Sequence, residues 1–497
     1  MARYRIGGRV TIEMLVLEPM NQQPMPSGRV LQPSAADARI TPITAPTRIV
    51  VAIVITIRRG TASRAPWERT FTARNLCFRR PVRNTPVSEM SLEIPLRAAT
   101  PDEFPKVRDL IDLVFAVAPS DEGEAEFKQW LEYDRSIVAD DGGELVATAS
   151  THTYHLTVPG GDTVPAGGLT IVTVKPTHRR RGLARRLLRR HLEDVRDHGE
   201  AVAMLYASES SIYGRFGFGS AVHMSEISIG RSHGAFRSDV PSPRGSFRLL
   251  DLHAAGPTMR RVFAEATAGI PGAVVPREQD WVTTMTDLPG RREGATPWRI
   301  AIYDRDGEPR GFARYRQKEA WGDGGPEGKV MVREVQAVDG EAFAALWRFV
   351  FDIDLAITIE AGNRPTPDPL RLLLADPRRL MEKSADALWV RIVDVATALS
   401  SRRYRVDGSL VIEVRDGFFE AGGRYRLKGG PAGATCERTE NPADISFDVE
   451  HLGAVFLGGQ SVARLAWVGL VSGDAAAIGL CDDMFSWSVT PANTVHF

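Results

Sequence analysis

Cysteine is scarce in this sequence of 497 residues. Its three cysteines, Cys77, Cys436 and Cys481, lie too far apart in the chain to form a CxxC pair. A zinc ribbon, an iron–sulfur cluster or a disulfide-stapled secreted fold needs more thiols at closer spacing. We therefore expect no bound metal, and we expect the chain to work in the reducing cytoplasm.

Long apolar runs are also missing. The longest run of note, residues 49–57, has nine residues between Arg48 and Arg58, whereas a helix that spans a bilayer needs about 18. The run also begins too late in the chain to be a signal peptide. We expect no membrane as a partner.

An excess of one charge is missing as well, because 62 basic residues balance 62 acidic ones. This balance excludes a strongly basic nucleic-acid-binding protein and an acidic disordered chain. The charges are unevenly distributed, however. Residues 1–89 carry fourteen arginines, no lysine and only five acidic residues, a net charge of +9, so the remaining chain carries −9. A net negative charge attracts cationic amines.

Residues 1–89 mix proline, arginine and short polar stretches, without a sustained helical or strand period. We expect them to be a basic, largely irregular N-terminal extension. Met90 is followed by a short strand pattern and then by Thr100 and Pro101, which are typical of a helix start. This order predicts that Met90 is the natural first residue. N-terminal sequencing of the native protein that found Ala2 would contradict this prediction.

The length of the chain and its 43% of apolar residues predict about three domains. Strands and helices alternate over residues 90–236, and a similar order returns over 246–395 after a linker rich in Ser, Pro and Arg. Residues 396–497 begin with a β-meander and continue with short helices, which is typical of an α+β domain. We therefore expect a mixed α/β chain with two similar domains and a third, different one.

The most informative segment runs from a strand at 169–174 through an arginine-rich turn into a helix. The turn reads R-x-x-G-x-A over residues 179–184, and the leucines of the following helix share one face. Such a turn leaves backbone N–H groups free at a helix N-terminus, where the helix dipole also favours a pyrophosphate. The flanking arginines add charge-assisted hydrogen bonds. The alternative is a solvent-exposed basic helix face.

A second informative segment follows the next strand. It reads A-S-E-S-S-I-Y-G-R-F-G-F-G over residues 207–219 and places Tyr213 in a glycine-rich turn. Simple core packing of Tyr213 beside Phe216 and Phe218 is the alternative to a functional role.

The turn at 179–184 closely resembles the pyrophosphate-binding turn of GNAT N-acetyltransferases. Together with residues 207–219 and the sequence L-W-V-R-I-V-D-V at 388–395, it resembles the Eis (enhanced intracellular survival) family of these enzymes. The resemblance covers about residues 92–497. It implies two GNAT domains, the second without the pyrophosphate turn, and a C-terminal domain like sterol carrier proteins. It also implies a homohexamer that acetylates primary amines, with aminoglycosides as substrates of some members.

The same resemblance implies site residues. Tyr213 would protonate the thiolate that leaves acetyl-CoA, and the terminal carboxylate of Phe497 would hold the amine or take its proton. The Val174 N–H would polarise the thioester carbonyl. The residues implied for binding the coenzyme are Val172, Thr173, Val174, Arg179, Arg180, Arg181, Gly182, Leu183, Ala184 and Ser208.

Several other residues have plainer explanations. His152, His155 and His178 are candidate bases, although His178 is expected to cap the turn or to face solvent. Trp130 would either line an amine pocket or pack in the core or in a lid. The acidic residues at 121–126 would attract a cationic substrate, although a solvated helix face is the commoner explanation.

Two positions depart from the family pattern. Ile171 stands where an aromatic residue lines the amine pocket, and Ser210 and Ser211 replace a glycine pair. These departures argue against carrying over a particular aminoglycoside.

We therefore predict an acetyl-CoA-dependent N-acetyltransferase. Its acceptor would be a primary amine of a cationic small molecule, such as an aminoglycoside or a polyamine, bound in a ternary complex. A protein lysine acetyltransferase is the alternative among enzymes. A regulator that binds CoA or lipid with an idle catalytic centre is the alternative from another class, since a fold does not confer the function of its relatives.

Overall fold

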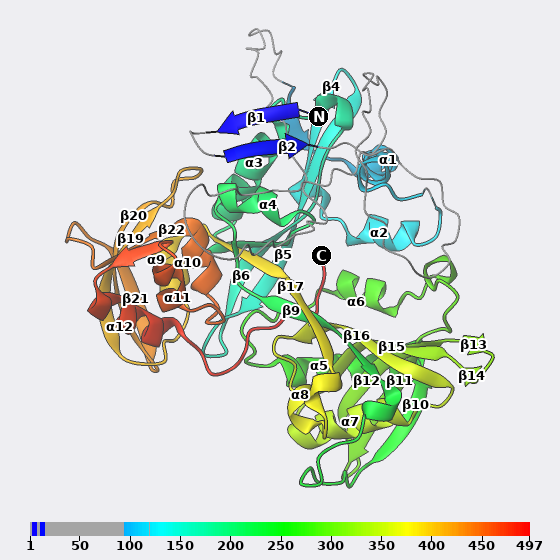
Figure 1. The fold of residues 1–497 in the computed structure, drawn as a ribbon. Coiled ribbons are helices and arrows are strands. Elements are labelled where there is room, and N and C mark those ends of the chain that lie inside the picture. Colours follow the sequence, from blue (N-terminus) through cyan, green and yellow to red (C-terminus); the bar gives the residue numbers. More distant parts are fainter. Residues whose placement is uncertain (1, 7–9, 15–93, 119) are drawn as a thin grey trace. The chain divides into compact units, whose positions relative to one another are not determined.

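The computed structural model describes most of the chain, namely residues 2–6, 10–14, 94–118 and 120–497. The chain divides into two compact units, residues 1–90 and residues 91–497. In the first unit, strands β1 (Ala2–Ile6) and β2 (Val10–Met14) pair in antiparallel fashion (Figure 1). The apolar run at 49–57, Cys77 and Met90 lie outside the described residues. In the part of the chain that is described, no helix is long and apolar enough to cross a membrane.

The second unit begins with a seven-stranded sheet in the order β3–β4–β5–β6–β7–β18–β8. Its strands are β3 (Leu96–Ala98), β4 (Ser136–Asp141), β5 (Glu144–Thr157), β6 (Thr163–Val174), β7 (Val202–Tyr206), β8 (Gly219–Ser220) and β18 (Leu388–Ile392). Side chains alternate between the two faces of a strand. Accordingly, Leu145 packs under helix α1 (Phe104–Phe115), and Val146 packs under helix α3 (Leu183–Asp197) on the other face. Two shorter helices, α2 (Glu124–Trp130) and α4 (Ser210–Tyr213), complete this part.

A second sheet of seven strands has the order β10–β11–β12–β15–β16–β9–β17. Its strands are β9 (His223–Gly230), β10 (Ser246–Asp251), β11 (Arg299–Arg305), β12 (Glu308–Lys318), β15 (Gly328–Ala337), β16 (Ala356–Pro365) and β17 (Met381–Asp386). Its helices are α5 (Leu252–Thr267), α6 (Glu278–Met285), α7 (Gly340–Asp352) and α8 (Leu370–Leu373). A small hairpin of β13 (Trp321–Gly322) and β14 (Gly325–Pro326) extends from it.

The two sheets exchange a strand, which departs from the boundaries expected at 90–236 and 246–395. β9 lies within the first expected range but pairs with β16 and β17 of the second sheet. β18 lies within the second expected range but pairs with β7 and β8 of the first sheet. Each sheet is completed by a strand from the other range, a long-range pairing that local sequence patterns do not encode.

The third domain is a five-stranded sheet with helices packed on it. The strand order is β21–β20–β19–β22–β23, with β19 (Gly408–Arg415), β20 (Gly423–Gly430), β21 (Gly433–Arg438), β22 (Ile445–Asp448) and β23 (Val471–Gly473). The helices are α9 (Val395–Ser400), α10 (Val449–Val455), α11 (Val462–Trp467) and α12 (Ala475–Phe485). Cys436 and Cys481 are buried, free thiols of this domain.

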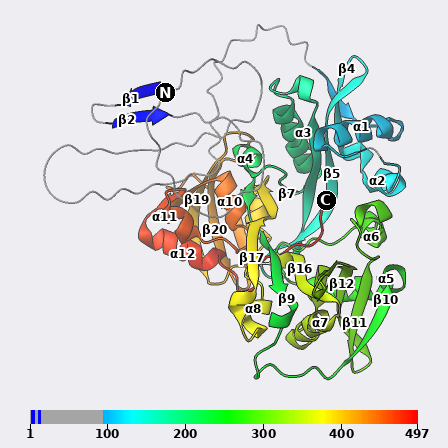
Figure 2. The same ribbon diagram turned by 45° about the vertical axis from the view of Figure 1, so that its right-hand side comes forward.

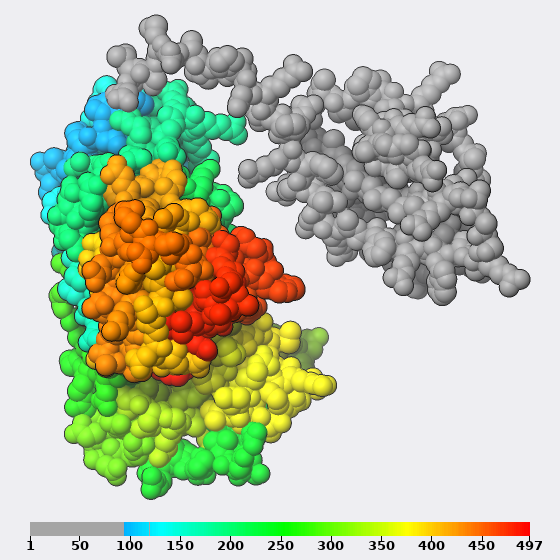
Figure 3. Space-filling view, turned by 90° about the vertical axis from the view of Figure 1, so that its left-hand side faces the viewer, coloured from blue at the N-terminus to red at the C-terminus, as the bar shows by residue number. Residues whose placement is uncertain are grey.

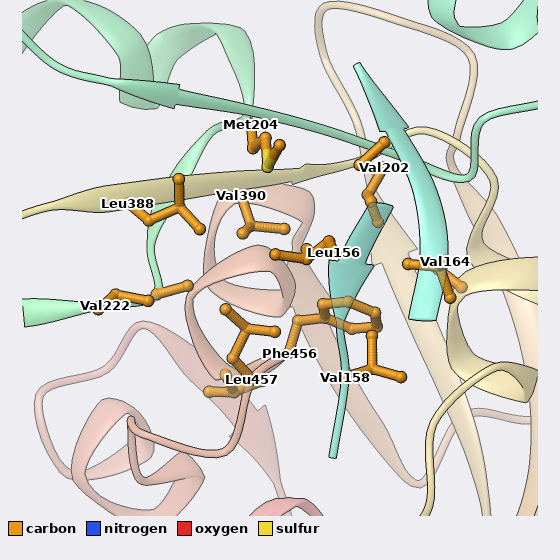
Figure 4. Packing of buried hydrophobic residues seen from close by; sticks show 14 of the residues in the cluster. Leu156, Val158, Val164, Val202, Met204, Val222, Leu388, Val390, Phe456 and Leu457 are labelled. Atoms are coloured by element: carbon orange, nitrogen blue, oxygen red, sulfur yellow. The ribbon is translucent and has the colours of Figure 1, made fainter. Parts of the chain in front are cut away.

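One hydrophobic core joins all three domains of the second unit. Leu156 of β5, Met204 of β7 and Val390 of β18 point toward Phe456 and Leu457, which follow helix α10 (Figure 4). The same cluster continues into α5 of the second domain and into α12 of the third. In Figure 3 the orange and red surface of the third domain lies directly against the other two domains. The first sheet is therefore packed against the third domain.

Candidate active site

Strand β6 is irregular at the point where it leaves its neighbour β7. The two strands pair in parallel only as far as Leu169 and separate beyond it. On the other edge of β6 the register with β5 shifts, because Ile171 and Val172 together face the single residue Ala149. Ile171 has a φ of 44° at this bulge. A bulge bends a strand away from its partners, so β6 and β7 open toward their C-terminal ends.

The backbone of Val174 faces the space between β6 and β7. In an antiparallel pair, residues alternate between hydrogen-bonding to the partner strand and pointing away from it. The Lys175 N–H donates to the Val146 oxygen of β5 at 2.8 Å, so the Val174 N–H points to the opposite side, away from β5. The intervening Thr173 is only 1% exposed, and its side chain lies on the opposite face from that of Val174.

Helix α3 begins with backbone N–H groups that no side chain caps within the described part of the chain. Its N-cap is Gly182, with a φ of 83°, and Arg180 has a φ of 64°. A Cβ added to Gly182 would meet no atom within 4 Å among the described residues, so the space in front of the helix is open. Free N–H groups and the helix dipole together make this N-terminus suitable for an anion.

These elements border a cleft of about 760 Å³. The cleft is lined by most of the residues predicted for the site: Val172, Val174, Arg179, Arg180, Gly182, Leu183, Ala184, Ser208 and Tyr213. Arg179 Nε also donates to the Val174 oxygen at 3.4 Å. Thr173 and Arg181 do not line the cleft, which departs from the expectation for these two. Thr173 is buried, and Arg181 is exposed.

The sequence reasoning missed several residues of this cleft, and three of them are informative. Arg185 lies one turn into α3 and sits over the Phe418 ring of the third domain at 4.8 Å. Arg215 follows Tyr213 and lies over the Phe216 ring at 5.1 Å. Both arginines fall inside the two informative segments, so their charge was an available signal. The third residue, Phe115 at the end of α1, gave no local signal.

Tyr213 ends helix α4 at the same cleft and is 6% exposed. Burial raises the pKa of its phenol, while a hydrogen bond with Ser208 opposes that rise. The phenol therefore keeps its proton at neutral pH. Its ring packs against Phe218 at a centroid distance of 6.3 Å, so core packing and a place in the cleft are combined in one residue.

The glycines around Tyr213 allow the third domain to approach closely. A Cβ on Gly219 would overlap the backbone oxygen of Glu450 in α10, and one on Gly214 would lie 2.6 Å from the Glu450 carboxylate. Gly217 has a φ of 85° and turns the chain between them. Helix α10 thus packs directly on the turn that carries Tyr213.

The second domain repeats the order of strand, helix and parallel strand with β15, α7 and β16. At the N-cap of α7, however, Asp339 accepts a hydrogen bond from the Ala342 N–H at 2.9 Å. Arg305 binds the same carboxylate at 2.7 Å. A carboxylate therefore occupies the end of α7 where α3 leaves its N–H groups free. This agrees with the expectation that the second domain lacks the pyrophosphate turn.

A network of polar and aromatic residues joins the first two domains near β5. Trp130 Nε1 and Tyr154 Oη each donate to Asp280 of α6 at 3.0 Å. Arg277 binds Asp280 at 2.8 Å and sits over the Tyr154 ring at 4.9 Å. The ring of His152 lies 4.1 Å from that of Trp130.

The candidate histidine bases are poorly suited to that role. Burial, with Arg277 and Arg135 nearby, holds the pKa of His152 well below its usual value. Both ring nitrogens of His178 have partners, Thr177 at 2.8 Å and Asp141 at 3.1 Å. His155 is exposed. Among the described residues, no group of three His, Cys, Asp or Glu side chains is placed to hold a metal ion.

The C-terminal residue lies beside the first sheet, as both ribbon views show (Figures 1 and 2). The Phe497 ring packs against Tyr154 of β5 at 4.9 Å and against Tyr206 of β7 at 5.4 Å. Among the ion pairs of residues 94–118 and 120–497, none involves the Phe497 carboxylate. The terminus is thus placed at the same sheet as the cleft, although it does not line the cleft itself.

Family comparisons agree with this architecture. Residues 95–221 and 272–392 each match an acetyltransferase (GNAT) domain, and residues 395–493 match a sterol carrier protein domain. The fold and the comparisons together define a GNAT N-acetyltransferase. The GNAT family implies the use of acetyl-CoA.

More specifically, the chain belongs to the Eis family of N-acetyltransferases. It is 31% identical to the N-acetyltransferase Eis of Mycobacterium tuberculosis over 388 aligned residues. This alignment covers 76% of this chain and 92% of that protein. It is 40% identical over 366 residues to an uncharacterised N-acetyltransferase of Streptomyces avermitilis, covering 73% and 89%. The crystal structure of an Eis protein from Mycobacterium abscessus superposes with a TM-score of 0.71 at 32% identity, covering 81% of this chain and 100% of that one. The predicted family and fold class are therefore confirmed.

Proposed function

We propose that this chain transfers the acetyl group of acetyl-CoA directly to a primary amine of a small molecule in a ternary complex. One observation supports this most strongly. A single cleft brings together the N-terminus of α3, the open edge of β6 and the phenol of Tyr213. Direct transfer from a thioester needs an anion site, a donor for the carbonyl oxygen and an acid for the thiolate, and these three elements can supply them.

The residues of the cleft suit the coenzyme as follows. The N–H groups at the start of α3 would bind the pyrophosphate, and the exposed guanidinium groups of Arg179, Arg180 and Arg185 would add charge-assisted hydrogen bonds. The edge of β6 at Val172 and Val174 would pair with the amide groups of the pantetheine arm, because β7 leaves this edge free beyond Leu169.

The same geometry assigns roles in the transfer. The Val174 N–H donates to the thioester carbonyl oxygen while the amine nitrogen forms its bond to the carbonyl carbon. The carbon–sulfur bond then breaks, and Tyr213 gives its proton to the sulfur. The ammonium form of the acceptor first loses a proton to the medium, because only the neutral amine can attack. After the attack the nitrogen loses a second proton to the medium, and the Tyr213 phenolate regains one from it. Residues of this chain need form no covalent bond to the acetyl group.

The acceptor amine arrives as an ammonium ion, which suits the terminal carboxylate of Phe497. The pKa of such a carboxylate is near 3.5 in water, so it would hold the ammonium more effectively than it would deprotonate it. The aminoglycoside and polyamine acceptors, the homohexamer and the cytoplasmic location stay predictions at this stage.

Replacing Tyr213 by Phe tests the assigned acid. We expect kcat to fall at least 100-fold with little change in the KM for acetyl-CoA, because the phenol acts on the leaving thiolate and not on binding. With Tyr213 present, kcat should not fall between about pH 7 and 9.5, since burial raises the phenol pKa above its usual value near 10. Thiol release from acetyl-CoA measures both quantities.

The matched control is Tyr133→Phe, which removes a phenol that donates to the Lys128 oxygen outside the cleft. It should leave kcat unchanged. Unchanged turnover in Tyr213→Phe would remove Tyr213 as the acid.

A panel of aminoglycosides, polyamines and lysine peptides distinguishes the proposed function from its two alternatives. No thiol release with any member of the panel, together with retained acetyl-CoA binding, would favour a binding protein. Activity on the peptides alone would favour a protein lysine acetyltransferase.

A further inference from the structure

Three arginines of the second domain face a hollow of about 520 Å³ between the first two domains. Arg314 and Arg316 lie two residues apart on β12, so both side chains are on one face of the sheet. Arg333 comes from the neighbouring strand β15. Helices α1 and α2 of the first domain form the opposite wall, with Ile111 and Trp130.

Arg333 is aimed into the hollow by a β-bulge. The register of β12 with β15 pairs Arg314 with Glu334 and Tyr315 with Val332, which leaves Arg333 as the extra residue. A bulge re-aims the side chain that it carries. Arg333 consequently borders this hollow, a neighbouring one of about 180 Å³ and a third one on the sheet face.

The positive charges of these arginines are poorly compensated. Arg314 is 7% exposed, and burial lowers its pKa to about 10. Its Nε has no hydrogen-bond partner among the described residues. The ring of Trp298 lies 4.8 Å from the guanidinium of Arg314 and 4.4 Å from that of Arg316. In the described part of the chain, none of the three arginines is within 4.0 Å of a carboxylate, although Arg314 pairs with Glu334 across the strands.

Buried cations normally have a partner, because an uncompensated charge is costly to desolvate. Three acids line the hollow: Asp112, Glu126 and Asp287. Glu126 lies on α2 and, among the described residues, is not within 4.0 Å of any of the three arginines, while the other two acids bind arginines elsewhere. Asp112 binds Arg108 at 2.8 Å, and Asp287 binds Arg292 at 3.2 Å. The hollow therefore offers guanidinium groups to an anion from outside the chain.

This hollow adjoins the smaller hollow beside the C-terminal residues of the chain. It shares Trp130, Arg314 and Arg333 with the smaller hollow, which is also lined by Thr494, Val495 and His496. Burial and the nearby Arg333 lower the pKa of His496 to about 4. On the other side, α1 separates the hollow from the coenzyme cleft, since Ile111 lines the one and Phe115 the other.

We propose that the acceptor amine carries an anionic group, a carboxylate or a phosphate, and that Arg314, Arg316 and Arg333 bind it. This inference rests on the proposed function and specifies its substrate class. Guanidinium groups bind carboxylate and phosphate by paired hydrogen bonds. A polycation, by contrast, would meet three arginines at the wall of the hollow, so an acceptor of mixed charge suits the site better.

The test compares acceptors that differ only in the anionic group. Glucosamine 6-phosphate is paired with glucosamine, and lysine is paired with lysinamide. Initial rates of thiol release with acetyl-CoA give kcat/KM for each. We expect at least one anionic member to be preferred at least tenfold over its partner. The pair that shows the preference tells whether the group is a phosphate or a carboxylate.

Arg333→Gln is the diagnostic variant, because this side chain is exposed and its loss should not disturb folding. We expect it to raise the KM of the anionic acceptor at least tenfold and to leave unaffected the KM of acetyl-CoA and that of the partner that lacks the anionic group. Lys318→Gln is the control. It removes a positive charge outside the hollow, from the exposed end of β12, the strand of Arg314 and Arg316, and should leave the KM of both acceptors unchanged. The equal effect of Arg333→Gln on both members of a pair would overturn the proposal.

Failure of this inference differs from failure of the proposed function. Equal kcat/KM for both members of each pair would refute the anionic acceptor and leave the transfer reaction in place. If no amine is acetylated, the proposed function fails, and calorimetric titration with glucosamine 6-phosphate decides the arginine site alone. Binding that Arg333→Gln weakens at least tenfold would support the site, and binding indifferent to Arg333 or to the phosphate would refute it.

Discussion

Replacing Gly182 by Asp would give α3 the same N-cap as α7, and it tests where the pyrophosphate binds. The new carboxylate would lie about 5 Å from a bound phosphate. At an effective dielectric constant of about 20, two unit charges at that distance repel by roughly 3 kcal/mol. Since each 1.4 kcal/mol is tenfold in affinity, we expect acetyl-CoA binding to weaken at least 100-fold.

The fold should tolerate this change. A Cβ on Gly182 meets no described atom within 4 Å, so the added side chain has room. Holding a non-glycine residue at a φ of 83° costs about 1–2 kcal/mol, and an Asp in place of Gly at an N-cap returns only a few tenths of a kcal/mol. The melting temperature should therefore fall by only a few degrees. Asp and Asn are also the residues that best tolerate this backbone conformation.

Gly182→Asn is the matched control, because it adds a side chain of nearly the same shape without the charge. Isothermal titration calorimetry with acetyl-CoA gives Kd for both variants, and steady-state kinetics gives the KM. The Asp variant should bind at least 100-fold more weakly than the Asn variant, because the two differ only in the charge, and the difference should shrink in 1 M salt. Equal affinity of the two variants would refute a pyrophosphate at the N-terminus of α3.

Two further predictions concern the contacts that the third domain and the chain end make with the first sheet. Gly219→Ala should lower the free energy of unfolding by about 3 kcal/mol or more in urea denaturation, because its Cβ would overlap the Glu450 backbone. Gly479→Ala is the control: it has open space in α12 and should raise the free energy of unfolding slightly. A Gly219→Ala variant of unchanged stability would contradict this packing. One glycine added after Phe497 should lower kcat at least tenfold without weakening acetyl-CoA binding in calorimetry. The Phe497 ring packs on Tyr154 and Tyr206, and the extension moves the terminal carboxylate one residue away from that ring. A fully active extended enzyme would exclude a role for that carboxylate.

The features that the sequence predicts well are local. The turn and the start of α3 follow from consecutive residues, because Gly182 permits a positive φ and the next residues continue as a helix. The glycine-rich segment with Tyr213 is equally local. Both segments can therefore be identified from the sequence. Together with β6, they supply the nine predicted residues that line one cleft.

The features that the sequence does not predict depend on distant pairings. The arginines of β12 and β15 meet only because those strands pair and a bulge turns Arg333 inward. The exchange of β9 and β18 likewise joins segments more than a hundred residues apart. Neither pairing leaves a periodic pattern in the local sequence. The seat of Phe497 beside Tyr154 is of the same kind, since residues from opposite ends of the second unit form it.

The exchange of β9 and β18 also determines when the first sheet can be completed during synthesis. A ribosome that has made β7 must add about 180 residues before Leu388 of β18 can pair with Tyr206. At roughly 5–20 residues per second this takes about 10 to 40 s, during which the edge of β7 lacks its final partner. An open strand edge is prone to aggregate. During this interval the first sheet of the nascent chain lacks β18, so the free edge of β7 can pair with other chains.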